Sequence, residues 1–174
     1  MIEVFDDRME ITNPGRPLVP TDRLLDQPPR SRNEKLASLM RRVGICEERG
    51  SGIDKVVFQI ELFQLPAPLF EVPGESMRVV LFGHRVLKDM EKTDRVRACY
   101  LHACLRYVTR QPMTNTSLRE RFGIDEKNAA VASRLLNEAI EAGAILVRDP
   151  ETGTRNRTYL PFWAAVSTAK EGIA

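Results

Sequence analysis

The chain has 174 residues, of which 43% are hydrophobic and 29% are charged, and its formal net charge is +2. This length allows one large domain or two small ones, and the composition is ordinary for a soluble protein. No apolar run approaches the length of a membrane span and Met1 opens directly into a strand-like run, so we expect neither a membrane partner nor a signal peptide. The three cysteines (Cys46, Cys99 and Cys104) are odd in number and lack the spacing of a disulfide framework, which indicates a reducing, cytoplasmic location.

The positive charge is concentrated in the second half of the chain. Residues 1–83 carry 11 Lys and Arg against 13 Asp and Glu, whereas residues 84–165 carry 14 against 10. A module that binds the phosphates of nucleic acid needs such an excess, so the charge distribution indicates that the second half is the part that would bind nucleic acid.

The first 83 residues begin with strands and loops. Apolar residues on both sides of the polar turn Asp6-Asp7-Arg8 predict a hairpin or strand-turn-strand over Ile2–Thr12. Asn13-Pro14-Gly15 ends it. The segment Arg16–Ser31 holds four prolines and no clear period, which predicts a long loop with at most one helical turn.

Two helices and two further strands complete this part. Asn33 is placed to cap a helix over Glu34–Arg42, and a second helix is expected over about Ile53–Phe63 before the prolines that follow. Leu69–Val72 and Met77–Phe82 read as strands around a Pro-Gly turn.

A long helix is expected within His84–Thr109. Its apolar stripe recurs at helical spacing and comprises Val96, Cys99, Tyr100, Ala103, Cys104 and Tyr107.

The stretch after this helix has the pattern of a helix-turn-helix. Thr114 caps a short helix that ends at Phe122, because Gly123 adopts the left-handed conformation cheaply. Asp125 caps a second helix, Glu126–Ala142. Its core stripe is Ala132, Leu135, Leu136, Ala139 and Ile140.

A hairpin is predicted next, from a strand over Ile145–Val147, a turn over Asp149–Gly153 and a returning strand over Arg155–Leu160. Helix, turn, helix and hairpin is the winged-helix order. The string VASRLLNEAIEAGAILVRD resembles the winged-helix domains of bacterial transcription regulators.

Three strings of the first half, IEVFDDRMEITNPG, RNEKLASLMRRVGICEERGSGIDKV and PLFEV with MRVVL, resemble one family in order and spacing. It is the C-terminal domain of RecG-helicase-related transcriptional regulators, a divergent histidine-kinase-type ATPase fold that also precedes winged helices.

The resemblance implies where a nucleotide site would lie. Asn13 and Gly15 fall at the first glycine box, with Asn13 in place of an adenine-binding Asp, and Gly50, Ser51 and Gly52 fall at the second glycine box. Glycines before a helix can cradle phosphate, but a tight loop explains them as well. Arg16-Pro17 replaces a glycine region, and the family's metal-linked Asn would lie before Met1. We therefore expect no ATP binding, no cofactor and no metal.

Neither the cysteines nor the histidines form a recognisable metal or catalytic motif. Cys99, His102 and Cys104 lie close in sequence, but Cys104 is rotated away on a helix, which favours two core cysteines and a surface histidine over a metal site. The histidines, His84 and His102, suggest no Ser-His-Asp or Cys-His set.

These observations predict an α+β fold, with an incomplete ATPase-like α/β sandwich at residues 1–83, a winged helix-turn-helix at residues 84–165 and a mobile tail at residues 166–174. The predicted function is duplex DNA binding in transcriptional regulation rather than catalysis. Arg and Asn can read purine edges, and Lys and Arg can meet phosphate or the minor groove, so the predicted DNA-binding residues are Lys127, Asn128, Arg134, Asn137, Arg155 and Arg157.

Two alternatives stay open at this stage. One is a nucleotide-dependent switch or ATPase whose site is completed by segments upstream of Met1. The other is a winged helix that binds only protein. In either case half a sandwich leaves apolar surface uncovered, and winged-helix regulators often read two half-sites, so a homodimer is expected.

Overall fold

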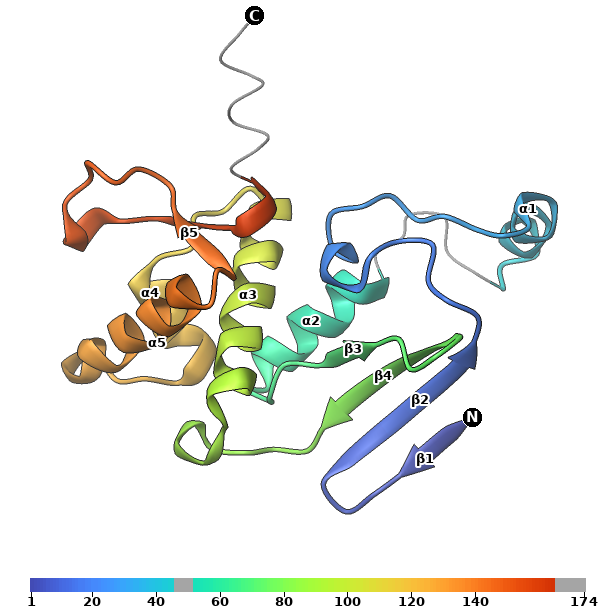
Figure 1. The fold of residues 1–174 in the computed structure, drawn as a ribbon, viewed down its shortest axis with the longest axis horizontal. Coiled ribbons are helices and arrows are strands. Elements are labelled where there is room, and N and C mark those ends of the chain that lie inside the picture. Colours follow the sequence, from blue (N-terminus) through green and yellow to red (C-terminus); the bar gives the residue numbers. More distant parts are fainter. Residues whose placement is uncertain (46–51, 165–174) are drawn as a thin grey trace, which may run out of the picture.

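The N-terminal region is built on four antiparallel strands, β1 (Ile2–Val4), β2 (Arg8–Pro14), β3 (Leu69–Glu71) and β4 (Ser76–Phe82), in the order β1-β2-β4-β3. They are seen in a computed structural model that describes residues 1–45 and 52–164 (Figure 1). The hairpin and the later pair of strands predicted from the alternating pattern are confirmed.

The two faces of this sheet differ in character. Residues opposite one another in the register, such as Ile2 with Ile11 and Val4 with Met9, lie on one face, because side chains alternate along a strand. The intervening residues are largely charged, and Glu10 accepts an ion-pair contact from Arg8 at 2.7 Å. In β1 and β2 one face is therefore apolar and the other charged, and the charged face of β2 lies beside the buried Val80 of β4.

Two helices accompany the sheet, and both predicted helices are present. The Asn33 side chain accepts a hydrogen bond from the Leu36 amide at 3.0 Å and so caps α1 (Glu34–Arg42), none of whose residues is buried. The second helix, α2 (Gly52–Leu62), buries Val57 and Ile60. It runs between the sheet and the C-terminal helices, whereas α1 lies at the far end of the molecule (Figure 1).

The central element is α3 (Lys92–Val108), which carries residues of two adjacent cores on different faces. One core faces the N-terminal region and includes Val57, Ala67, Leu101, Cys104, Leu160 and Trp163. The other faces the C-terminal helices and includes Cys99, Ala103, Met113, Leu118, Leu135, Leu136 and Ile145. Burying both faces of one helix joins the two regions into one packed body.

The C-terminal region continues with α4 (Asn115–Phe122) and α5 (Ala129–Glu141), followed by the antiparallel pair β5 (Ile145–Val147) and β6 (Tyr159–Pro161). An isolated bridge pairs Met113 with Tyr159. Short 3-10 helices fill the connections at Thr21–Arg23, Leu87–Asp89, Glu126–Asn128, Thr154–Asn156 and Phe162–Ala164. The mixed helix and sheet content confirms the predicted α+β class.

The long proline-rich loop is fixed to the C-terminal region by aromatic residues. The Trp163 indole donates to the Tyr100 hydroxyl at 3.1 Å, and that hydroxyl donates in turn to the Asp22 carbonyl. Among the described residues no helix has the length and hydrophobicity needed to cross a membrane. The predicted tail, residues 166–174, lies outside the described residues.

Candidate nucleic-acid interface

Local sequence signals fix the two ends of α4 and the turn that leads to α5. The Thr114 side chain accepts from the Ser117 amide at 3.1 Å, while the Ser117 hydroxyl accepts from the Thr114 amide at 3.0 Å, so two otherwise unpaired donors are satisfied. At the other end Gly123 has φ +62, a conformation that a Cβ disfavours, and it turns the chain sharply. Asp125 then accepts from the Lys127 amide at 3.1 Å.

The outer face of α5 presents two of the predicted residues. Arg134 and Asn137 are exposed and lie three residues apart, hence on one face, while Ala132, Leu135 and Leu136 are buried behind them. The structure corrects the start of this helix, because Lys127 and Asn128 lie in a 3-10 turn before α5 rather than within it. The Asp125 cap favours that turn, since its bond to the Lys127 amide closes a tight local loop.

Charges around this face are partly neutralised. Glu138 receives two hydrogen bonds from the Arg95 guanidinium, at 3.1 and 3.2 Å, and Lys127 lies 3.6 Å from the Asp125 carboxylate. Within the described part of the chain, Arg134 has neither an ion pair nor a side-chain hydrogen bond, so its guanidinium is available to a ligand.

The sequence analysis did not predict that polar residues on α4 lie beside the outer face of α5. The Asn115 amide donates to the Ala129 carbonyl at 3.2 Å and to the Ser133 hydroxyl at 3.0 Å, which joins α4 to the outer face of α5. Arg119 donates to Asn115 Oδ1 at 3.2 Å and to the Thr116 hydroxyl at 3.2 Å. The i, i+4 pair Asn115 and Arg119 was the available signal for a polar stripe on this helix.

The loop between β5 and β6 differs from the expected strand. Arg155 lies in the 3-10 helix Thr154–Asn156, and the returning strand begins only at Tyr159, so the prediction that Arg155 and Arg157 alternate on one strand is wrong. Arg155 is exposed, whereas Arg157 is half-buried and donates to the Thr152 carbonyl at 3.2 Å. Arg157 therefore holds the loop in shape and Arg155 projects from it.

Three of the five residues implied for a nucleotide site, Asn13, Gly15 and Gly52, lie within the described part of the chain. Asn13 is exposed in β2 opposite Met77, and the Gly15 amide donates to the Glu75 carbonyl at 2.7 Å as the strand ends. Gly52 begins α2, while Gly50 and Ser51 fall outside the described residues. A small cleft beside α2 is lined by Pro17, Leu18, Val19, Leu24, Gln27, Pro29, Arg30 and Ile53, and Asn13, Gly15 and Gly52 are not among its lining residues.

The junction of α2, α3 and α4 holds a polar chain that the sequence did not suggest. His102 Nδ1 lies 2.9 Å from a Glu61 carboxylate oxygen, and its Nε2 lies 3.0 Å from the Ser117 hydroxyl. These are the types of group found in nucleophilic triads. However, Ser117 is only 3% exposed and its hydroxyl also serves the cap of α4. The arrangement is therefore a structural link, and His102, predicted to lie at the surface, is buried.

Burial also determines the state of the cysteines. It raises the pKa of the Cys99 and Cys104 thiols to about 12, so both remain protonated at neutral pH. Cys99 packs in one core and Cys104 in the other. Within the described residues no three His, Cys, Asp or Glu side chains gather to hold a metal ion.

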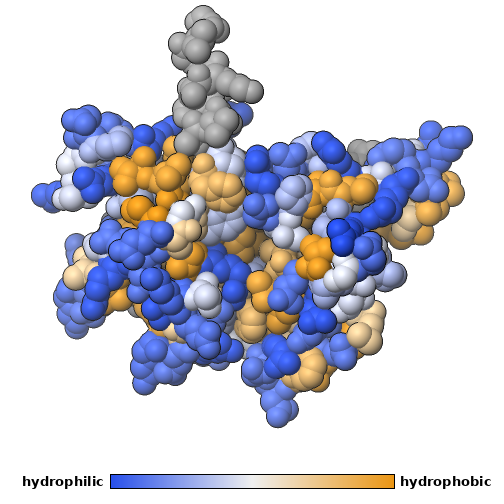
Figure 2. Space-filling view, in the orientation of Figure 1, coloured by the Kyte–Doolittle hydropathy of each residue, from blue (hydrophilic) through white to orange (hydrophobic). Residues whose placement is uncertain are grey.

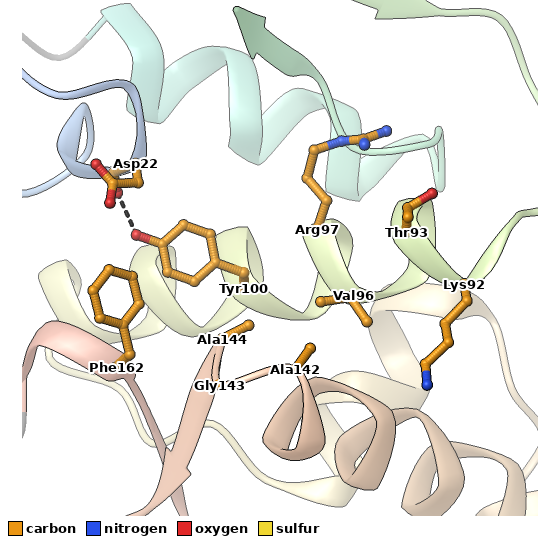
Figure 3. Close-up of a pocket in the computed structure, with 10 residues that line it drawn as sticks. All are labelled: Asp22, Lys92, Thr93, Val96, Arg97, Tyr100, Ala142, Gly143, Ala144 and Phe162. Atoms are coloured by element: carbon orange, nitrogen blue, oxygen red, sulfur yellow. Dashed lines mark hydrogen bonds between the residues drawn. The ribbon is translucent and has the colours of Figure 1, made fainter.

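An apolar groove of about 520 Å³ runs along α3, between the end of α5 and Phe162. Figure 3 shows the Tyr100 and Phe162 rings at one end, with centroids 5.7 Å apart, and Lys92 at the other end. Ala142, Gly143 and Ala144 form one wall and Val96 the facing wall (Figure 3).

Comparisons with known proteins find one family model and one solved structure that resemble this chain. Residues 1–81 match the family described as "Putative ATP-dependent DNA helicase recG C-terminal", which confirms the predicted resemblance over those residues. A comparison with curated proteins finds no match. The crystal structure of the DIP2311 protein from Corynebacterium diphtheriae is similar with a TM-score of 0.39 and 12% identity, over 88% of this chain and 44% of that chain. The chain thus spans less than half of that protein's length.

Proposed function

We propose that residues 92–164 form a winged helix that binds duplex DNA in transcriptional regulation. The observation that supports this most is the exposed, unneutralised face of Arg134 and Asn137 on the second helix of a helix-turn-helix, followed by a hairpin. An isolated bridge from Met113 to Tyr159, with an amide-to-carbonyl distance of 3.0 Å, lies at the place of the short third strand usual in this architecture.

In this proposal α5 enters the major groove. A helix of this width fits the groove, and there Arg134 is suited to donate two hydrogen bonds to a guanine edge, while Asn137 is suited to pair with adenine. Lys127 and Asn128, at the N-terminal end of α5, would meet the flanking phosphates. A good bidentate contact discriminates against the wrong base by about 1–3 kcal/mol.

The neighbouring elements would supply contacts that carry no sequence information. Arg119 on α4 and Arg155 in the loop between β5 and β6 both lie outside the cores, where they can reach phosphates on either side of the groove. Arg157 would act indirectly, because its bond to Thr152 stiffens the loop that carries Arg155.

Arg134→Ala tests the base-reading role. We expect it to weaken binding to a selected operator by about 1–3 kcal/mol, with little effect on random duplex, when anisotropy is measured at two salt concentrations. Arg42→Ala, which removes an exposed arginine at the end of α1, is the matched control and should bind as the wild type does. Equal affinities of Arg134→Ala and wild type for the operator would remove Arg134 from the interface, and absence of any duplex binding would leave a protein-binding winged helix.

We also propose that the N-terminal region pairs with a second copy of the chain. The apolar face of the sheet is open at its edge, where Ile2 is 66% and Val4 75% exposed, and Leu36 and Leu39 of α1 are exposed as well. Hydrophobic side chains are visible on this side of the molecule (Figure 2). Apolar patches of this kind, next to an unpaired strand edge, are typical of interfaces. Sedimentation at micromolar concentration should give twice the chain mass, and a monomer throughout the concentration range would refute the pairing.

A further inference from the structure

A second cleft lies between the C-terminal end of α3, the start of β6 and the loop that carries Arg23 and Asp26. Its volume is about 840 Å³, within the range of small-molecule sites. Its walls combine three aromatic residues with three arginines: Tyr107, Tyr159, Trp163, Arg23, Arg110 and Arg148.

The three arginines are not equivalent. Arg23 donates to both oxygens of Asp26, at 2.8 and 2.5 Å, and lies over the Trp163 ring at 4.5 Å, so its charge is neutralised. Arg110 and Arg148 are exposed, and within residues 1–45 and 52–164 neither side chain forms an ion pair or a hydrogen bond. The cleft therefore keeps two unneutralised positive charges.

The backbone at Arg110 gives a second reason to look for a ligand. Arg110 lies two residues beyond the end of α3, after the capping residue Thr109, and has φ +57; the Gln111 amide closes the helix by donating to the Arg106 carbonyl at 2.8 Å. Gly44, Gly123 and Gly143 fill the corresponding position after α1, α4 and α5, and Gln64, with φ +52, fills it after α2. A residue with a Cβ is disfavoured in this conformation, and such strain is concentrated at functional sites.

The cleft is distinct from the face of α5. Its lining residues Leu160 and Trp163 belong to the core on the side of α3 that faces the N-terminal region, whereas α5 packs on the other core. The Tyr107 ring meets the Trp163 ring edge-on, with centroids 5.0 Å apart, which fixes the orientation of both aromatic walls.

We propose that this cleft binds a small anion with an aromatic or flat apolar body. Arg110 and Arg148 hold its phosphate or carboxylate through charge-assisted hydrogen bonds, and its ring packs against the tyrosines. Because Arg23 comes from the N-terminal region and the other walls from the C-terminal region, the ligand contacts both.

Phenyl phosphate is the first probe, because it joins the two chemical features. Trp163 is the single tryptophan of the chain, so its fluorescence reports on the cleft, and calorimetry measures binding independently. We expect saturable binding of phenyl phosphate at least tenfold tighter than that of inorganic phosphate, and none of phenol. If neither method detects binding at about 10 mM phenyl phosphate, the dissociation constant is too high for a specific site and the proposal is overturned.

Arg110→Gly separates a ligand contact from a structural role. It removes the guanidinium but places the residue best suited to a positive φ at the end of α3, so the melting temperature should stay or rise while affinity for phenyl phosphate falls about tenfold or more. Arg148→Gln should lose affinity similarly, and Arg155→Gln, outside the cleft, should keep it. Unchanged affinity in both cleft variants refutes the assignment.

Duplex DNA is the other source of phosphate, and the same variants distinguish it. Arg110→Gly and Arg148→Gln should leave the salt dependence of duplex binding unchanged, because the cleft is not part of the α5 face. A lower salt slope in these variants, together with no binding of phenyl phosphate, assigns both arginines to the DNA interface and overturns the small-anion proposal.

Discussion

The helices α1 and α5 are both amphipathic, but they differ in whether their apolar side chains are buried. The apolar stripe of α5 is buried at Ala132, Leu135, Leu136 and Ala139, of which Ala132 and Ala139 are fully inaccessible to solvent. In α1, Leu36 remains 52% and Leu39 57% exposed. An apolar stripe specifies a helix in either case, but only packing against another element stabilises it strongly. One of the two cores is thus built from the C-terminal region alone, whereas the N-terminal region leaves apolar side chains of α1 and β1 exposed.

The two sheets show the same difference. In the pair β5 and β6, Ile145 of β5 is fully buried, and Tyr159 of β6 is bridged to Met113. The larger sheet ends in β1, whose three residues are all exposed. The region of residues 1–81 that matches the RecG C-terminal family is therefore the part whose packing is less complete.

A leucine in each region gives the largest expected contrast. Leu118→Ala, at a position with no solvent exposure, should lower the free energy of unfolding by about 4 kcal/mol, because it removes methyl groups and leaves a cavity. Leu39→Ala, on the open face of α1, should cost less than about 1 kcal/mol in dilute solution. Urea unfolding measures both.

Protein concentration makes this comparison sharper. If α1 packs against a second copy, the cost of Leu39→Ala should grow with concentration, since pairing stabilises the folded state by mass action. The cost of Leu118→Ala should stay constant. A large, concentration-independent cost at Leu39 would contradict the picture of an uncovered helix.

The junction between the regions gives the next effect. Arg121 is buried, with Nε 3.7 Å from a Glu61 oxygen and Nη2 2.6 Å from the Leu65 carbonyl. Burial lowers the pKa of the Arg121 guanidinium, and the charge of Glu61 opposes that shift. Glu61→Gln should therefore cost about 3 kcal/mol, because a buried cation loses its counter-charge.

A double variant identifies the cause of that cost. Arg121→Met keeps an apolar body in the same space without the charge, so Glu61→Gln combined with Arg121→Met should be more stable than Glu61→Gln alone. Denaturation of the four proteins in this cycle gives the coupling energy. Strictly additive costs would mean that Glu61 acts only through His102.

The contrast between the regions also shows what sequence can predict. Strand alternation, the Asn33 and Thr114 caps and the glycine at the end of α4 depend on neighbouring residues, and these elements are present as predicted. The partners of His102 come from other helices, 41 residues earlier and 15 later, and local spacing carries no signal for such contacts.

The prediction of a strand in the loop between β5 and β6 was wrong for a different reason. Alternation of polar residues over Arg155–Leu160 suggested a strand, but the Arg157 guanidinium bonds to the Thr152 carbonyl and the chain turns through a 3-10 helix at Thr154–Asn156. In the candidate interface, Arg134 and Asn137 could be placed from the helical period, whereas the contacts of Asn115 across to α5 required the packed helix pair.

The smallest expected effect concerns phosphate contacts, and it tests which region meets the DNA backbone. Arg155→Gln should lower the log–log slope of duplex affinity against salt by about 0.9, because one phosphate loses its counter-charge. Arg157→Gln should change the slope less, since that guanidinium is half-buried against Thr152. Lys35→Gln removes the same charge from exposed α1 and should leave the slope as it is, if only the C-terminal region contacts duplex. Fluorescence anisotropy over 50–200 mM salt, roughly the range in which phosphate contacts dominate, measures all three. An equal fall for Lys35→Gln and Arg155→Gln would place the N-terminal region on the DNA too.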